Sequence, residues 1–157
     1  MEMVEEEFHP YIMFLPAKEK FDILKTIFGS EVPLKILEFS ISKGVSAKIF
    51  QRELIRKLPY SNKTVIEHLK TLVRFRILSE HMEKKQIDNR VVWVKYYRLS
   101  EVGKWFAFLL AEEKLTREEK SQILRNIFRA YIRWVRKLSE KLDVSVESLR
   151  KIFTEEL

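Results

Sequence analysis

The chain of 157 residues has little or none of several residue types, and each absence excludes a class of protein or site. It has no cysteine, which excludes disulfide frameworks, thiolate metal sites and cysteine nucleophiles. With 3 glycines and 4 prolines it has neither a glycine-rich phosphate loop nor a loop-rich fold. Its longest apolar runs, at 105–111 and 11–15, are too short to span a bilayer. Its first residues are acidic where a secretion signal is basic. These features predict a helix-rich cytoplasmic protein without a membrane partner.

Positive charge is concentrated in the middle of the chain. Residues 47–104 carry 14 Lys and Arg against 6 Asp and Glu, whereas residues 1–46 have a balance of −3 and residues 105–157 of +2. A solvated basic surface would scatter this excess. Its localisation indicates a polyanionic partner.

Hydrophobic periodicity divides the chain into helices and one hairpin. The pattern predicts helices over 18–28, 33–44, 46–58 and 61–75, then β-runs over 77–85 and 91–99. Between the runs, Asp88 and Asn89 tolerate the left-handed backbone of a hairpin turn. Further helices are predicted after Ser100, over 116–141 and after Ser145. The central order is helix, helix, short turn, helix, hairpin, which is typical of a helix–turn–helix followed by a wing.

The helix after the short turn has two contrasting faces. On a helical wheel, Val65, Leu69 and Leu72 lie on one side. The opposite side carries mostly basic and hydroxyl-bearing groups, namely Lys63, Thr64, Lys70, Thr71 and Arg74, together with the acidic Glu67. Such a helix fits the major groove of DNA. A merely solvated face is the alternative, but the adjacent turn, hairpin and charge excess favour DNA.

Two stretches resemble a known family. SNKTVIEHLKTLVRFRILSE, followed by VVWVKYYRLSEVGK, resembles the winged helix–turn–helix transcription regulators of the ArsR and MarR types. The matching residues are Thr64, Val65, His68, Leu69, Lys70 and Leu72 in the helix, and Tyr97, Leu99, Ser100 and Gly103 after it. The resemblance covers roughly residues 32–111. It implies a mainly α, α+β fold: a winged helix–turn–helix with a two-stranded wing and additional N- and C-terminal helices.

The resemblance also implies which residues approach DNA. Asn62, Lys63 and Ile66 stand where the family approaches bases, and Ile66 can touch a thymine methyl group. Ser61, the expected N-cap of this helix, is counted with them among the DNA-binding residues. Glu67 replaces a common Arg, and it either accepts from a cytosine amino group or repels phosphate. The family's glycine after this helix is replaced around Phe75–Arg76, which alters the expected turn.

The predicted hairpin adds three basic residues, Lys84, Lys85 and Arg90, which we expect to cluster at its tip. There they would contact the DNA backbone or the minor groove. The alternative is that lysines on a strand discourage sheet pairing.

No cofactor, metal site or catalytic constellation is predicted, and the chain is not expected to be an enzyme. His81 and Glu83 form an alternating pair that is more typical of a surface. The stripe of Phe128, Tyr131 and Trp134 indicates core or dimer interface, with an effector pocket as the alternative. Residues 138–153 resemble the first two helices of a second helix–turn–helix, but their acidic content favours a structural role.

Three regions are therefore expected: an N-terminal helical segment (1–31), a winged-helix DNA-binding domain (32–111) and a C-terminal helical dimerisation or interaction region (112–157). The hypothesis is a homodimeric regulator that binds specific double-stranded DNA. A protein-interaction adaptor in a transcription or replication complex is the alternative, with contacts to transcription machinery, and an RNA-binding winged helix is a third. Low Asn and Gln content resembles that of hyperthermophiles and favours an archaeal source.

Overall fold

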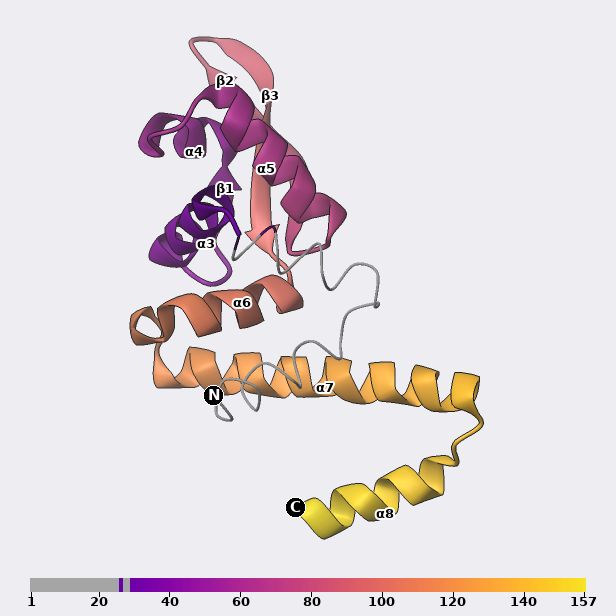
Figure 1. The fold of residues 1–157 in the computed structure, drawn as a ribbon. Helices are drawn as coiled ribbons and strands as arrows, with labels where there is room; N and C mark the ends of the chain where they lie inside the picture. The colour runs from indigo at the N-terminus through magenta and orange to yellow at the C-terminus, as the bar shows by residue number, and fades with distance from the viewer. Residues whose placement is uncertain (1–25, 27–28) are drawn as a thin grey trace.

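The computed structural model describes residue 26 and residues 29–157. The predicted helix over 18–28 lies, apart from Thr26, outside these residues. Within them the order of elements begins with a helix, a short strand, two helices and a long hairpin (Figure 1). These are α3 (Glu31–Lys43), β1 (Ile49–Phe50), α4 (Gln51–Lys57), α5 (Asn62–Arg74), β2 (Leu78–Ile87) and β3 (Arg90–Leu99). They are followed by α6 (Glu101–Ala111), the 3-10 turn η1 (Glu112–Lys114), α7 (Arg117–Leu142) and α8 (Val146–Glu156).

The three strands form one antiparallel sheet in the order β1-β3-β2. Leu78 of β2 lies opposite Leu99 of β3, and Ile49 of β1 lies opposite Tyr97. Helices α3, α4 and α5 accompany this sheet, and β2 and β3 project beyond them as a hairpin (Figure 1). This is a winged helix–turn–helix, and the predicted fold class is confirmed.

The strand β1 corrects the prediction of a single helix over 46–58. Ile49 and Phe50 are extended and pair with Tyr97 and Tyr96, and only Gln51–Lys57 is helical. Ile49 is 1% exposed, so it is buried as predicted, but it is buried as a residue of the sheet and not of a helix. The pairing partner is almost fifty residues away, which the local pattern could not reveal.

The hairpin turn confirms the prediction made for Asp88 and Asn89. Their φ angles are 48° and 62°, which is the left-handed region, and Ile87 lies directly opposite Arg90. A two-residue turn with both residues left-handed matches the twist of antiparallel strands. Because the turn is so short, both strands are longer than the predicted runs 77–85 and 91–99.

The hydrophobic core lies between the helices and the end of the sheet where Leu78 pairs with Leu99. It is built around fully buried side chains, among them Ile36, Leu37, Leu54, Leu69, Leu72 and Phe106. Helix α3 contacts both α5 and α6, which explains why its apolar residues spread over more than one stripe. The core therefore fixes α5 against the sheet through one face only.

The end of α5 is closed without the glycine that the resemblance led us to expect. Arg76 adopts φ 61°, its N–H donates to the carbonyl of Val73, and the N–H of Ile77 donates to the carbonyl of Leu72. This pair of bonds is the Schellman arrangement, in which a left-handed residue satisfies the last carbonyls of a helix. An arginine thus takes the position that usually favours glycine.

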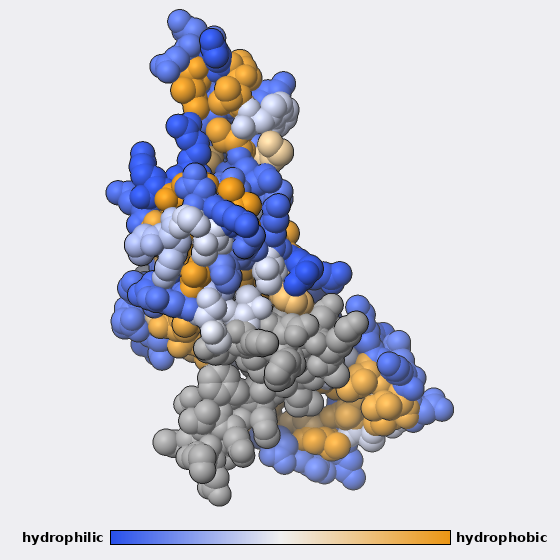
Figure 2. All heavy atoms as spheres, turned by 45° about the horizontal axis from the view of Figure 1, so that its top comes forward, coloured by the Kyte–Doolittle hydropathy of each residue, from blue (hydrophilic) through white to orange (hydrophobic). Residues whose placement is uncertain are grey.

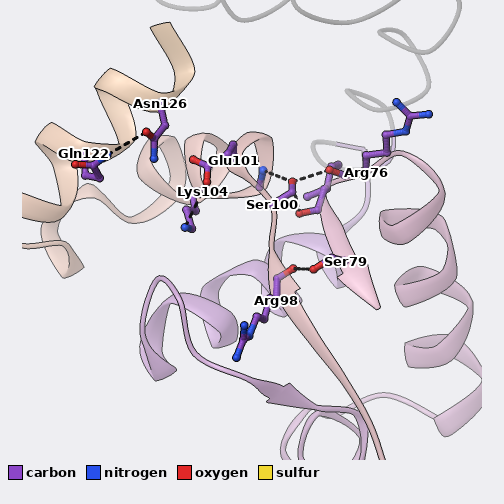
Figure 3. A network of polar contacts seen from close by, with 10 residues as sticks. Arg76, Ser79, Arg98, Ser100, Glu101, Lys104, Gln122 and Asn126 are labelled. Carbon is purple, nitrogen blue, oxygen red and sulfur yellow. Dashed lines mark hydrogen bonds and ion pairs between the residues drawn. The ribbon is translucent and has the colours of Figure 1, made fainter. Parts of the chain in front are cut away.

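The same turn is bonded to the start of α6 (Figure 3). The Ser100 hydroxyl lies 2.6 Å from the carbonyl oxygen of Arg76 and 2.9 Å from that of Ile77, and it caps α6 by accepting from the N–H of Gly103. A Cβ atom on Gly103 would lie 2.1 Å from the Ile77 oxygen, so glycine is required here by close approach. Ser100 and Gly103 therefore join α5, the hairpin and α6.

The C-terminal helices extend away from the winged helix (Figure 1). Thr116 and Glu119 form a capping box at the start of α7, which packs against α6. Its 26 residues make a helix about 39 Å long, and α8 folds back along it after the left-handed Asp143. No helix in the described part of the chain is long and apolar enough to cross a membrane.

Candidate nucleic-acid interface

Helix α5 buries one face and exposes the other, as the wheel predicted. Val65, Leu69 and Leu72 are completely buried. The exposed residues are Asn62, Lys63, Glu67, Lys70 and Arg74, with Thr64, Ile66 and Thr71 half-buried beside them. The sequence-predicted residues of this helix therefore share one accessible surface, which we call the α5 face.

Hydroxyl groups on the α5 face form hydrogen bonds within the helix that they belong to or cap. The Ser61 hydroxyl accepts the N–H of Thr64 at 3.1 Å and lies 2.8 Å from the Thr64 hydroxyl, which makes Ser61 the N-cap. The Thr71 hydroxyl donates to the carbonyl of Glu67. An N-cap of this kind stabilises a helix by about 1 kcal/mol. Ser61, Thr64 and Thr71 thus have structural bonds in addition to the predicted contacts.

The charges of the α5 face are not neutralised by neighbouring side chains. Within the described residues, Lys63, Lys70 and Glu67 have no ion-pair partner closer than 4 Å. Arg74 also lacks one there, and its guanidinium lies over the Phe75 ring at 4.9 Å. Three cations and one carboxylate leave this face positive. It can attract an anion without first breaking an ion pair.

The basic residues of the hairpin do not form the cluster that the sequence predicted. Lys84 lies opposite Trp93, with its amine 5.3 Å from that ring, whereas Lys85 points to the other side of the sheet and lies 4.9 Å from the Phe50 ring. Successive residues of a strand face opposite ways, so adjacent lysines cannot share a face. Of the three, only Arg90 adjoins the two-residue turn.

The register also places Lys84 on the side of the sheet that faces α5. Lys84 shares its parity with Leu78, which is buried in the core against the helices. Lys85 shares its parity with His81 and Glu83 on the opposite side. Lys84 therefore lies on the same side of the sheet as Leu78, and Lys85 lies on the other.

Two further basic residues were missed at the sequence level. Arg52 and Arg56 of α4 are exposed and line a groove with Lys85 beside the hairpin. The remaining lining residues are Phe50, Glu53, Ile87, Val94 and Lys95. The basic residues of the segment QRELIRK are visible in the sequence. Their place next to the hairpin is not, because it depends on the pairing of β1 with β3.

The histidine and glutamate on β2 have ordinary surface partners. His81 Nε2 lies 2.8 Å from the Ser79 hydroxyl, and its ring stacks on Tyr96. Glu83 forms an ion pair with Lys48 at 2.7 Å. No group of three or more His, Cys, Asp or Glu side chains able to hold a metal ion occurs within the described residues.

An apolar groove separates α7 from α8. It is lined by Tyr131, Ile132, Val135, Arg136, Val146, Leu149, Arg150 and Phe153. Phe128 reaches across to Phe153, with ring centroids 5.6 Å apart. Of the predicted aromatic stripe, Tyr131 lines the groove and Phe128 touches α8. This surface is mainly apolar and open to solvent, unlike the charged α5 face.

Comparison with known proteins gives a faint structural likeness. No protein-family model matches the sequence, and no curated protein matches it. A crystal structure of the adhesin competence repressor (AdcR) from Streptococcus pyogenes is 21% identical, covering 90% of this chain and 98% of that one, with a TM-score of 0.38. A C-terminally His-tagged form of the same repressor is 23% identical over 88% and 95%, with a TM-score of 0.37. These values do not establish a family, and the expected archaeal source stays a prediction.

Proposed function

We propose that this chain is a transcription regulator that binds specific double-stranded DNA through the α5 face. One observation carries the proposal: the helix after the turn presents three cations without ion-pair partners, directly beside a hairpin. A single α-helix fits the major groove, where side chains read base edges. In this arrangement the hairpin lies along the neighbouring backbone or minor groove.

The roles of individual residues follow from their positions along α5. Asn62, Lys63 and Ile66 lie in its first turns, where a recognition helix approaches bases, and Glu67 follows them one turn later. Lys70 and Arg74 lie nearer its end, where they can contact phosphates. Glu67 selects against sequences that bring a phosphate close, or accepts from a cytosine amino group.

Lys84 and Lys85 provide matched variants, because they are neighbours of the same type on opposite sides of the sheet. Lys84 lies on the α5 side, with Arg90 at the turn, and we assign both to the DNA backbone. Replacement of Lys84 by alanine should weaken binding to all duplexes alike and lower the salt slope by about one. Replacement of Lys85 should leave the slope nearly unchanged.

We further propose that the chain forms a homodimer through residues 112–157. Leu124, Phe128 and Ile132 are 59%, 40% and 45% exposed on one face of α7, and Phe153 and Ile152 are exposed on α8. Contiguous apolar surface of this kind is uncommon on monomers. A two-fold partner would bury it and pair two α5 faces on a palindromic site.

The oligomeric state can be tested by sedimentation velocity. We expect a dimer for the native chain and a monomer for Ile132→Glu, because a charge would be buried in the interface. Arg133→Glu is the control, since this neighbour points to solvent on the same helix. A native chain that sediments as a monomer over the micromolar range would contradict the dimer.

DNA binding can be tested by selecting bound duplexes from a random pool and measuring their affinity by fluorescence anisotropy. A regulator should bind the selected duplex at least about 1,000-fold more tightly than random duplex. Affinity should fall steeply between 50 and 200 mM salt, on the order of a hundredfold or more. Lys63→Ala should relax the sequence preference, at a cost of about 1–3 kcal/mol.

The control for these measurements is Lys151→Ala on α8, an exposed lysine outside the α5 face. A flat salt response, or equal affinity for selected and random duplex, would overturn the proposal and favour the adaptor alternative. Preference for single strands or stem-loops over duplex would instead favour RNA.

A further inference from the structure

One edge of β3 is left without a partner strand. The strand has ten residues, but β1 covers only Tyr96 and Tyr97 of that edge. Residues 90–95 pair with β2 on one side, and their other edge makes no backbone bond to any described residue. Alternate N–H and C=O groups therefore point outward along six residues.

This edge carries an apolar run, Val91–Val94, in an otherwise charged region. Val91 is 66% exposed and Trp93 60% exposed, and the register puts both on the face opposite to Val92 and Val94, of which Val94 is buried. Figure 2 shows hydrophobic residues gathered on the projecting end of the molecule, which is the hairpin in Figure 1, with hydrophilic residues around them. A long, exposed apolar edge is a template for another strand, and proteins ordinarily shield such edges.

A groove runs along this edge, and its rim is basic. Arg52 and Arg56 of α4 stand on one side, and Arg90 and Lys85 of the hairpin on the other. The apolar residues that line it are Phe50, Ile87, Val92, Trp93 and Val94.

The charges of this groove are unequal. Among the described residues, Arg52, Arg56 and Arg90 have no ion-pair partner. The groove's carboxylates are Glu53, which is already paired with Lys43, and Asp88. An acidic ligand would therefore meet cations that have no competing internal partner.

We propose that this edge binds an extended acidic segment of another protein, which adds to the sheet as a strand beside β3. The backbone of such a segment would continue the sheet where β1 stops. Side chains of a strand alternate between its two faces, so its acidic side chains would meet Arg52 and Arg56 in the groove, and its apolar side chains would lie on the opposite face beside the exposed Val91 and Trp93. This inference does not rest on DNA binding.

The chemistry of the edge favours a peptide over a nucleic acid. The edge offers N–H donors and C=O acceptors in alternation, and a peptide backbone supplies both partners, whereas a phosphate only accepts. The exposed Val91 and Trp93 beside this edge likewise suit the apolar side chains of a peptide better than a sugar–phosphate chain. Most hairpin residues that line the groove, namely Lys85, Ile87, Arg90, Val92 and Val94, lie on the side of the sheet opposite to Lys84. Arg90 at the turn adjoins both proposed surfaces, whereas Arg52 and Arg56 belong to the groove alone.

The test uses the full chain and a fluorescent hexapeptide, acetyl-Glu-Val-Glu-Val-Glu-Val-amide. Anisotropy should show saturable binding at concentrations below about 1 mM. The lysine counterpart of the peptide should not bind, because it meets the same cations. Two N-methylated peptides should then be compared, one methylated at its odd-numbered amides and the other at its even-numbered amides. Only one of them should lose binding, since only one set of peptide N–H groups faces β3. Amide exchange by NMR should slow at alternate residues between 90 and 95.

Variants then locate the site. Arg52→Glu and Arg56→Glu should each weaken the peptide by about tenfold or more. Arg125→Glu on α7 is the matched control and should leave it unchanged, because Arg125 is exposed far from the groove. Circular dichroism of each variant verifies that it is folded.

Three results would overturn the inference. In the first, the peptide does not bind the native chain. In the second, it binds the Arg52 and Arg56 variants as tightly as the native chain, and both N-methylated peptides bind as tightly as the unmethylated one. Alternatively, selected duplex DNA slows the amides of 90–95 and loses affinity in Arg52→Glu, which would make the groove part of the DNA surface. If the native chain binds DNA but not the peptide, only this inference fails. If it binds the peptide but not DNA, only the proposed function fails.

Discussion

Replacement of Gly103 by alanine tests the joint that holds α5, the hairpin and α6 together. The added Cβ would lie 2.1 Å from the Ile77 carbonyl oxygen and 3.3 Å from a methyl of Leu99. The first distance is shorter than ordinary van der Waals contact by more than about 1 Å. The obstacle is a backbone atom, so no side-chain rotation can relieve it. The start of α6 must therefore move away from the turn after α5.

The cost of that movement follows from the bonds at the joint. The Ser100 N–H donates to the Ile77 oxygen at 3.0 Å, and the Ser100 hydroxyl lies 2.9 Å from it. Each such bond contributes about 1 kcal/mol net, and overpacking adds about 1–3 kcal/mol. Alanine recovers about 1 kcal/mol through its higher helix propensity. We expect a net loss of about 2–4 kcal/mol in the free energy of unfolding.

Urea denaturation followed by circular dichroism measures this loss. Lys104→Ala is the control, because the next residue of the same helix makes only a partly exposed ion pair with Glu101 at 3.7 Å. Ser100→Ala should cost about 1–2 kcal/mol, and the double variant with Gly103→Ala should cost less than the two singly because they break the same bonds. If Gly103→Ala unfolds within about 0.5 kcal/mol of the native chain, the reasoning from close approach is wrong.

Three other changes test separate features. Arg76→Gly should raise the free energy of unfolding by about 0.5–1 kcal/mol in urea denaturation, because glycine adopts the left-handed backbone without strain; a loss would contradict this. Thr116→Ala should cost about 1 kcal/mol in the same assay, because it removes the capping box of α7; an unchanged midpoint would refute it. Burial raises the pKa of Tyr97 to about 12 from its ordinary 10.0, so its contribution to stability is complete below pH 10 and is lost as the pH rises through 12. Tyr97→Phe should therefore lose less stability than the native chain between pH 10 and 12; equal losses would contradict this.

The local patterns were sufficient for elements whose stabilising contacts lie within the element or at its ends. The two faces of α5, its Ser61 cap and the left-handed turn at Asp88 and Asn89 are all fixed by nearby residues. The paired motifs around α5 and β3 also predicted the winged helix. Gly103 matched the family pattern, but the reason for it, a backbone oxygen 2.1 Å from any Cβ, depends on a contact with Ile77.

What the sequence did not reveal depends on non-local pairing. The strand β1 exists because two residues meet β3 at Tyr96 and Tyr97, and its apolar pair reads equally well as part of a helix. Strand alternation puts Lys84 and Lys85 on opposite sides in any register, but the register decides which of them lies on the side of Leu78, and a shift by one residue would exchange them. The α5 residues stay predictions as DNA contacts, although their accessibility agrees with the hypothesis.

The short β1 has consequences for both proposed surfaces. Because it ends at Phe50, the chain turns at once into α4, which brings Arg52 and Arg56 beside the uncovered part of β3. A longer β1 would cover the apolar residues Val91–Val94 and remove the groove. The hairpin would still present Lys84 on the α5 side, since that depends only on its pairing with β2. The two surfaces have Arg90 in common and can be separated elsewhere: changes at Arg52 or Arg56 should spare DNA binding, and changes to the α5 face should spare peptide binding.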